Sequence, residues 1–249
     1  MKRIVFIGFA LANIVKLSAQ LSVDQTLSTC YGQTAFGLAK SRGLYQNTMV
    51  VGNHYQYGIG RSTSIGGGII PLGFGEGTGV YGVGVFHTFN ISQVLYQSKS
   101  EAIKIGAFGA SDYLPLWYPY PGLAGAFALY SRKFDDRNMA TLGYSFMGSY
   151  LYIPWSNLVS FNYKRALPNK QLGVEIGAVF RWSGVYSAFQ DYGWADRNFR
   201  LSLLLTKKLK KNNSLFVGIT GWAHYEWEPA YFDEYFNAAW PVIGYTKHF

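Results

Sequence analysis

Hydrophobic and polar residues alternate with a period of two along most of this chain. From Leu172 to Trp182, apolar side chains occupy every second position, and the positions between them include glycine, glutamate and arginine. Successive side chains of a β-strand point to opposite faces, so this pattern predicts a strand with one apolar and one polar face. The same alternation recurs in 51–59, 159–164, 199–206 and 215–220, with Asn53 as an exception on the apolar face.

Twelve antiparallel strands account for the pattern, and ten or fourteen are the alternatives. We expect them at 29–39, 47–59, 63–72, 79–89, 101–110, 122–132, 139–149, 157–166, 171–183, 198–209, 214–224 and 239–249. Every second connection is short and polar, whereas those between are often longer and aromatic. This asymmetry is typical of a transmembrane up-and-down β-barrel, with periplasmic turns and external loops. The stretch 90–100 is longer than the scheme allows.

Three segments carry no formal charge over a bilayer's length, namely 77–98, 113–131 and 141–163. Glycines interrupt the first and prolines interrupt the other two, so all three are poor helices. Without helical spans, a closed barrel is the remaining way to satisfy backbone polar groups in lipid.

Composition supports the same fold class. Aromatic residues make up 18% of the chain and charged residues 14%, whereas soluble domains average about 25% charged. The mean hydropathy is close to zero, at +0.03. A barrel with a lipid face and a polar interior has this balance. A soluble exported β-sandwich, whose strands also alternate, is the main rival.

The N-terminal residues resemble a secretory signal peptide, with a buried helix as the alternative. Lys2 and Arg3 precede a short apolar run, and Ala19 offers a small residue for cleavage. We therefore divide the chain into a signal peptide, 1–19, and one barrel domain, 20–249. Removing three cations with the first segment lowers the formal charge from +9 to +6. The remaining basic residues form no single stripe, and export argues against nucleic acid as a partner.

The last residues alternate and end on Phe249. Such an ending resembles the signal by which the barrel-assembly machinery recognises its clients, so that machinery is an expected partner during biogenesis. Together with the signal peptide it predicts the outer membrane of a Gram-negative cell, with lipid and lipopolysaccharide as surroundings. Cys30 is the single cysteine, which excludes an intrachain disulfide.

The stretch from Gly43 to Leu72 resembles outer-membrane barrels of Bacteroidota. The similarity rests on GLYQNT at 43–48, YGI at 57–59 and SIGGGIIPL at 64–72. That family has no assigned activity. The resemblance therefore implies a location and an architecture, and it supplies no site residues.

No catalytic set, cofactor motif or metal motif emerges. A barrel hydrolase needs a histidine placed to activate a nucleophile. His87 is followed by Thr88 and Phe89, so the expected His-x-Ser pair is missing. The acidic stretch 224–234 matches no protease or metal spacing, and an aromatic-anchored external loop explains it better. We therefore predict a protein that is not an enzyme, with no catalytic, cofactor or metal residues.

The leading functional hypothesis is a narrow, porin-like passive channel. Its lumen would be mildly basic and would favour a small anionic solute. The candidate lumen residues are His54, Gln56, Lys104, Asn162, Lys164, Glu175, Arg181 and Arg200. The candidate external-loop contacts are Trp117, Tyr118, Tyr120, Glu226, Trp227, Glu228, Asp233 and Glu234. The alternatives are a non-conducting barrel in a secretion, gliding or adhesion assembly and, less favoured, a lipid or peptide hydrolase.

Overall fold

The computed structural model describes residues 34–48, 52–74, 82–112, 123–148, 156–168, 172–183, 197–209, 213–225 and 238–249. The predicted signal peptide 1–19, Cys30 and all eight candidate external-loop contacts lie outside these residues. Across the described part, no helix has the length and apolarity needed to cross a membrane.

Twelve β-strands form a single closed sheet. In chain order they are β1 Gly43–Thr48, β2 Gly52–Gly58, β3 Thr63–Phe74, β4 Gly82–Gln97, β5 Glu101–Asp112, β6 Leu123–Lys133, β7 Asn138–Gly148, β8 Ser156–Ala166, β9 Leu172–Ser183, β10 Arg197–Lys208, β11 Asn213–Tyr225 and β12 Ala238–His248. Each strand pairs antiparallel with its sequence neighbours, and β1 pairs with β12 to close the ring. The predicted all-β, twelve-stranded, antiparallel up-and-down barrel is confirmed.

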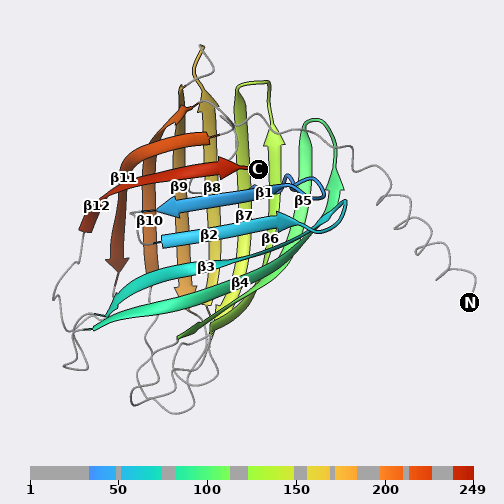
Figure 1. Cartoon of the computed structure of the whole chain (residues 1–249). Helices are drawn as coiled ribbons and strands as arrows, with labels where there is room; N and C mark the ends of the chain where they lie inside the picture. The colour runs from blue at the N-terminus through green and yellow to red at the C-terminus, as the bar shows by residue number, and fades with distance from the viewer. Residues whose placement is uncertain are drawn as a thin grey trace, which may run out of the picture.

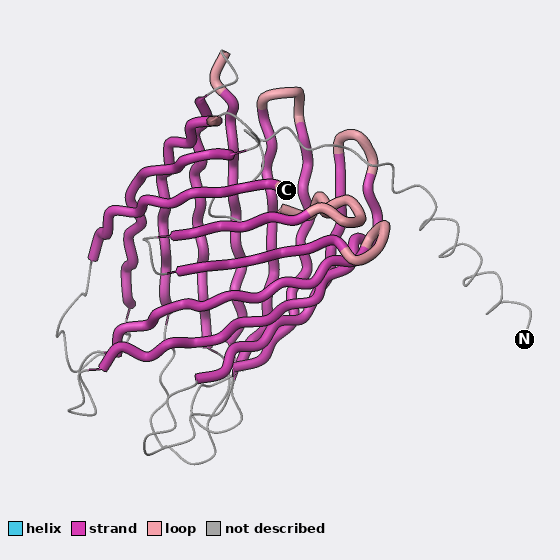
Figure 2. Tube along the Cα trace, in the orientation of Figure 1, coloured by secondary structure: helices cyan, strands magenta, loops and turns pink. Residues whose placement is uncertain are grey.

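The barrel has two unlike ends. Figure 1 shows β1 to β4 crossing one wall, with β6 to β9 standing behind them. At one end the described connections 59–62, 98–100 and 134–137 are short turns, which Figure 2 shows as loops on the same side of the barrel. We call this the short-turn end. The backbones of Gly43 and Phe249 exchange two hydrogen bonds there, of 2.7 and 3.0 Å, so the ring closes at this end.

The outward face of the barrel is apolar over the described strands. Exposed side chains on neighbouring strands include Phe89 and Ile91 on β4, Leu201 and Leu203 on β10, and Ile219 on β11. A patch that encircles a molecule exceeds what a soluble monomer ordinarily exposes. The alternation therefore places the hydrophobic side chains outside, where a soluble sandwich would bury them.

Three strand boundaries differ from the sequence prediction. Residues 34–39 are not a strand, although 29–39 was expected to be one. The expected strand 47–59 is divided between β1 and β2, which are separated only by 49–51. The stretch 90–100, expected to be a connection, is strand to Gln97, and β4 carries a register shift between Val94 and Tyr96. An irregularity of this kind lets a long strand continue while its alternation slips by one residue.

Candidate functional site in the lumen

Polar side chains line the inward face of the barrel. Most of these polar residues are next in sequence to an exposed apolar residue. Neighbouring side chains of a strand point to opposite faces, so the polar ones point inward. Gln56 donates to the Ser64 hydroxyl at 3.1 Å, and the Ser64 and Ser92 hydroxyls lie 2.9 Å apart. The other buried hydroxyls are Ser131, Thr141, Ser202, Thr206, Ser214, Thr220 and Thr246. The described lumen wall is therefore largely a surface of neutral hydrogen-bonding groups.

A non-strand segment lies inside the barrel against this wall. We name residues Thr34–Arg42 the strap. At its start, the Thr34 and Ser131 hydroxyls lie 3.3 Å apart, and the Ala35 amide donates to the Ser131 hydroxyl at 2.8 Å. Farther along, the Gly37 amide donates to the Gln97 side chain at 3.1 Å. The strap thus passes from β6 to β4 along the inside of the short-turn end.

The strap continues toward β2 before it enters β1. A side chain at Gly58 would collide with the backbone carbonyl of Ala39, so only a glycine leaves room for the strap there. The Ser41 amide donates to the Gly58 carbonyl at 2.8 Å, and Ser41 has a positive φ of 62°. A positive φ at a residue other than glycine marks a tight change of direction. It turns the strap out of the lumen and into the wall.

Lys104 on β5 holds the strap through two backbone carbonyls. Its Nζ donates to the Thr34 carbonyl at 2.6 Å and to the Phe36 carbonyl at 3.2 Å. The Lys104 residue is only 5% exposed. Hydrogen bonds to charged groups are stronger than neutral ones, and burial increases that difference. Lys104 lies on the inward face of β5, and its ammonium is engaged by the chain itself.

Phe36 anchors the strap in an apolar pocket. The Phe36 residue is 3% exposed and belongs to a buried cluster. The wall residues of that cluster are Ala102, Leu129, Met139 and Ala166, with Phe127 packed against them. The Lys133 ammonium lies 4.6 Å from the centre of the Phe36 ring. The wall from β5 to β8 therefore receives one aromatic side chain and its flanking main chain together.

A buried ion pair occupies the wall formed by β8 and β9. Lys164 Nζ and Glu175 Oε2 lie 3.4 Å apart, and both side chains are 3% exposed. Asn162 donates to Glu175 Oε1 at 2.7 Å. The three residues are neighbours because Lys164 pairs with Glu175 across the strands and Asn162 precedes Lys164 by two positions. Their register places all three on the inward face, where the structure joins them in one cluster.

The remaining wall, from β10 to β12, is filled by its own side chains. Leu204, Phe216 and Val242 form a buried apolar cluster on the inward face. A side chain at Gly244 would collide with the Phe216 ring, so the glycine accommodates the ring. Large and small residues therefore alternate across this wall, which gives it a packed inner surface.

The other predicted lumen residues lie on separate strands. His54 and Gln56 are on the inward face of β2, and Arg200 is on the inward face of β10, one position from exposed Leu201. Arg181 shares the inward register of β9 with Glu175, and its side chain lies outside the described set. His87 points outward on β4, away from the lumen.

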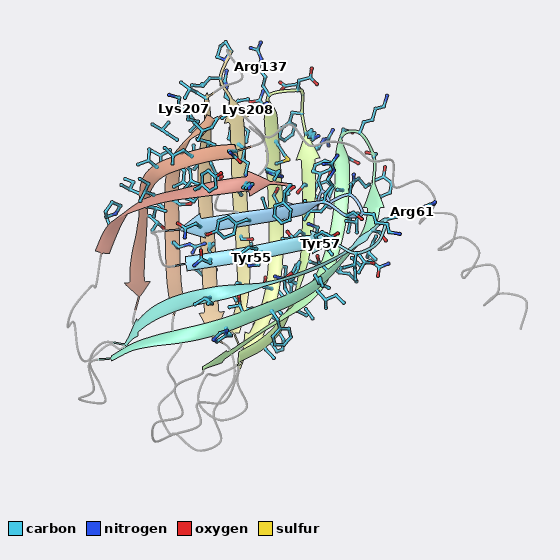
Figure 3. The ribbon with its side chains drawn as sticks, viewed as in Figure 1. Tyr55, Tyr57, Arg61, Arg137, Lys207 and Lys208 are labelled. Carbon is cyan, nitrogen blue, oxygen red and sulfur yellow. The ribbon has the colours of Figure 1, made fainter. Side chains whose placement is uncertain are left out.

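A ring of cations surrounds the short-turn end. Figure 3 shows Lys207, Lys208, Arg137 and Arg61 at this end. The exposed cations described there are Lys40, Arg42, Arg61, Lys99, Arg132, Arg137, Arg165, Lys207 and Lys247. The described acidic residues nearby are Glu101, Asp135 and Asp136, and Glu101 Oε1 lies 3.7 Å from Arg132. This mouth of the barrel is therefore strongly positive.

Outward tyrosines lie close to the same end. Tyr130 donates to Glu101 at 3.0 Å, and Tyr163 donates to Asn138 Oδ1 at 2.7 Å. Tyr57 and Tyr96 are exposed near the turn ends of β2 and β4, and Figure 3 shows Tyr57 on the outside. Rings with an apolar body and a polar tip suit the boundary between hydrocarbon and water. The tyrosines mark one edge of the apolar outer belt.

The sequence pattern did not predict the contacts of the strap. Residues 34–39 were assigned to a first strand, so Thr34 and Phe36 were given to the barrel wall. Phe36 is the only aromatic residue between Gln33 and Arg42, and a single aromatic residue in a mostly small and polar stretch could have indicated an anchor. Ser131 and Thr141 lay at inward positions of correctly predicted strands, but a hydroxyl alone carries no functional signature. Among the described residues, no group of three or more His, Cys, Asp or Glu side chains could hold a metal ion.

Comparisons with known proteins agree with the fold. No protein-family model matches the sequence, and no curated protein matches it. A solved structure described as "KdgM porin" is similar at a TM-score of 0.54 and 11% identity, over 84% of this chain and 99% of that one. Acinetobacter baumannii OccAB4 gives a TM-score of 0.42 and 12% identity, over 82% of this chain and 53% of that one. The second likeness is too distant to support a conclusion, and the first supports the β-barrel architecture.

Proposed function

We propose that this protein is a porin-like channel of the outer membrane that passes small anionic solutes. The observation that carries the proposal is the division of one closed sheet into an apolar outer face and a hydroxyl-rich inner face. A barrel satisfies its backbone within the sheet, so it can stand in lipid while its interior stays polar. The porin with a similar fold supports the same conclusion.

The proposed location follows from the belt and its edges. Exposed Phe, Ile and Leu side chains face outward on strand after strand, and tyrosines border them at the short-turn end. Outer-membrane barrels keep short turns in the periplasm, so we place the basic mouth there. A signal peptide at 1–19, a Gram-negative host and a Bacteroidota origin remain predictions from the sequence.

The preference for anions rests on charge. Lys104, Lys164, Arg200 and Lys208 lie on the inward face, where the acidic side chain of Glu175 also lies, and the register of β5 gives Asp112 an inward position as well. Glu175 offsets Lys164, and Lys104 is engaged by the strap. Arg200 and Lys208 on β10 are the other two inward cations of this set. Cations around the mouth attract anions and raise their local concentration.

Planar-bilayer recording tests the channel directly. Purified protein whose folded state is confirmed by heat-modifiable gel mobility should produce discrete conductance steps. Under a salt gradient, the reversal potential should indicate anion preference. Arg200→Gln should reduce that preference, whereas Lys207→Gln, on the outward face of the same strand, should leave it nearly unchanged. Folded protein without conductance above the lipid background would exclude the channel.

The strap favours a second candidate function, a non-conducting barrel that binds a partner. Residues Thr34–Gly37 occupy lumen space that an open pore would leave to water. Crosslinking in intact outer membranes followed by purification distinguishes the two. A channel should be recovered alone or with its own copies, whereas a structural barrel should be recovered with a defined partner.

A further inference from the structure

We propose that the lumen wall from β4 to β7 is a binding site for an extended peptide main chain, and that the strap is its removable occupant. The proposal rests on the channel function only for the consequence of removal, which is a wider pore. The site itself consists of contacts between the strap and the wall.

The wall offers main-chain partners in the order that an extended segment needs. Lys104 donates to the carbonyls of Thr34 and Phe36, two residues apart. Ser131 accepts the amide of Ala35, and Gln97 accepts the amide of Gly37. Alternating carbonyls and amides along the strap are therefore bound by three different strands. Side-chain identity matters at Phe36, whose ring fills the pocket, and at Thr34, whose hydroxyl contacts Ser131 and Met139.

The contacts of the strap differ from those of a strand. A β-strand exchanges backbone bonds with neighbouring backbone, and losing them would open the sheet. From Thr34 to Gly37 the strap instead uses wall side chains, while β4 to β7 keep their complete ladders with one another. While Ser41 and Arg42 keep their backbone bonds to Gly58, residues 34–37 can therefore leave without breaking the ring. In a chain whose twelve strands already close, these residues are dispensable for the barrel itself.

The strap lies at the short-turn mouth of the barrel, where its departure would change the width of the pore. Strap contacts with Met139 on β7, Val94 on β4 and Gly58 on β2 follow the inside of the short-turn end. A chain laid along the wall narrows this mouth. With the strap released, Lys104 would face the lumen as a free cation and would add to the anion preference proposed above.

Thiol accessibility tests the removable occupant without requiring conductance. The full chain carries Cys30→Ser and the reporter Ala35→Cys, and a large maleimide reports exposure of position 35 in the folded protein. Lys104→Met should raise the labelling rate roughly tenfold or more, because two charge-assisted bonds are lost. Lys99→Met, at an exposed position in the β4–β5 turn, is the matched control and should leave the rate unchanged. An equal rate in the Lys104 and Lys99 variants would overturn the proposal.

A variant in the strap guards against a wall substitution that prevents folding. Phe36→Ser removes the aromatic anchor and leaves every wall residue intact. It should raise labelling at position 35 while heat-modifiable mobility remains that of the folded barrel. If labelling rises only when this folded mobility is lost, the strap is part of the barrel and the proposal is wrong.

A disulfide lock connects the site to the pore. The Thr34 and Ser131 hydroxyl oxygens lie 3.3 Å apart, so Thr34→Cys with Ser131→Cys, in the Cys30→Ser background, places two thiols within bonding reach. The oxidised protein should show the smaller conductance, and reduction should increase it. Equal conductance in both states, together with fast labelling of the Lys104 variant, would refute the narrowing of the pore. No conductance in either state, with the same fast labelling, would refute the channel and leave the removable strap supported.

Discussion

The two sides of the lumen are filled in different ways. From β4 to β7 the inner wall is covered by the strap, a separate piece of chain held by Lys104 and the Phe36 pocket. From β8 to β12 the wall covers itself, with the Lys164–Glu175 pair and the Leu204 cluster. The first arrangement can change while the ring stays closed. The wall from β8 to β12 is filled by side chains of the barrel strands, so its filling cannot be removed separately. Two walls of one barrel can therefore differ in whether their filling can leave.

The largest expected effect is on the self-filled side. Glu175→Leu leaves the buried Lys164 ammonium without its carboxylate and should lower the free energy of unfolding by about 3–5 kcal/mol. Replacing both charges, with Lys164→Met and Glu175→Leu together, should restore most of that loss because an apolar pair can fill the same space. Denaturant unfolding in detergent, followed by tryptophan fluorescence, measures both.

The double variant also tests whether the unpaired Lys164 ammonium causes the loss of stability. If it is as unstable as Glu175→Leu alone, the Asn162 contact rather than the uncompensated lysine causes the loss. The pair would then be one member of a larger polar network.

A matched pair of truncations compares the two sides more directly. Leu204→Ala removes a side chain that is 0% exposed and should lower the free energy of unfolding by about 3 kcal/mol. Phe36→Ala should cost clearly less in the same experiment, although Phe36 is larger and 3% exposed. The reason is that local release of the strap can precede global unfolding. Equal losses would mean that the two sides unfold as one unit.

Most of the fold could be predicted because alternation continues without a break through most strands. From Leu172 to Ser183 and from Thr63 to Phe74, the expected and observed strands differ by a few residues at most. The prediction failed where alternation misrepresents the chain. Val50 and Val51 make the connection between β1 and β2 apolar, so 47–59 was expected to be a single strand. Strand β4 continues to Gln97, although 90–100 was expected to be a connection. The register shift between Val94 and Tyr96 interrupts the alternation there, so the sequence pattern showed no sign that the strand continues.

The lumen was predicted less completely than the wall. Alternation alone placed Gln56, Asn162, Lys164 and Glu175 on the inward face, and the cross-strand register then joined the last three. Register depends on pairing with a partner strand, which a single sequence does not specify by its own periodicity. The strap could not be found by that route, since its contacts join residues roughly one hundred positions apart in the sequence, as for Thr34 and Ser131.

The smallest expected effect lies outside both sides of the lumen, in the β6–β7 turn. The Asp135 carboxylate accepts the amides of Arg137 and Asn138 at 2.6 and 2.7 Å. These bonds, the Arg137 amide foremost, hold the pKa of Asp135 below its ordinary value. A lowered folded-state pKa stabilises the fold above the unfolded pKa of about 4, and the contribution is lost as pH falls through the folded value.

Asp135→Ala should therefore lower the thermal midpoint slightly at neutral pH, and the difference from the parent protein should shrink below about pH 4. Melting curves at a series of pH values measure it. Asp136→Ala, at the neighbouring exposed carboxylate, is the control, and at neutral pH it should change the thermal midpoint less than Asp135→Ala does. If the difference in thermal midpoint between Asp135→Ala and the parent protein stays the same below about pH 4, the loss of stability comes from the geometry of the turn and not from the carboxylate charge.

The pairing of β1 with β12 has a consequence for the order of assembly. This contact joins the first strand of the ring to the last, so it closes the longest loop in the molecule and carries the largest entropic cost of any pairing. Contacts this remote in sequence form slowly, which makes the seam the natural final step of folding. The strap enters β1 directly and lies inside the finished ring. Closing the seam therefore fixes the end of the strap that runs into β1, while residues 34–37 can still settle against the lumen wall afterwards.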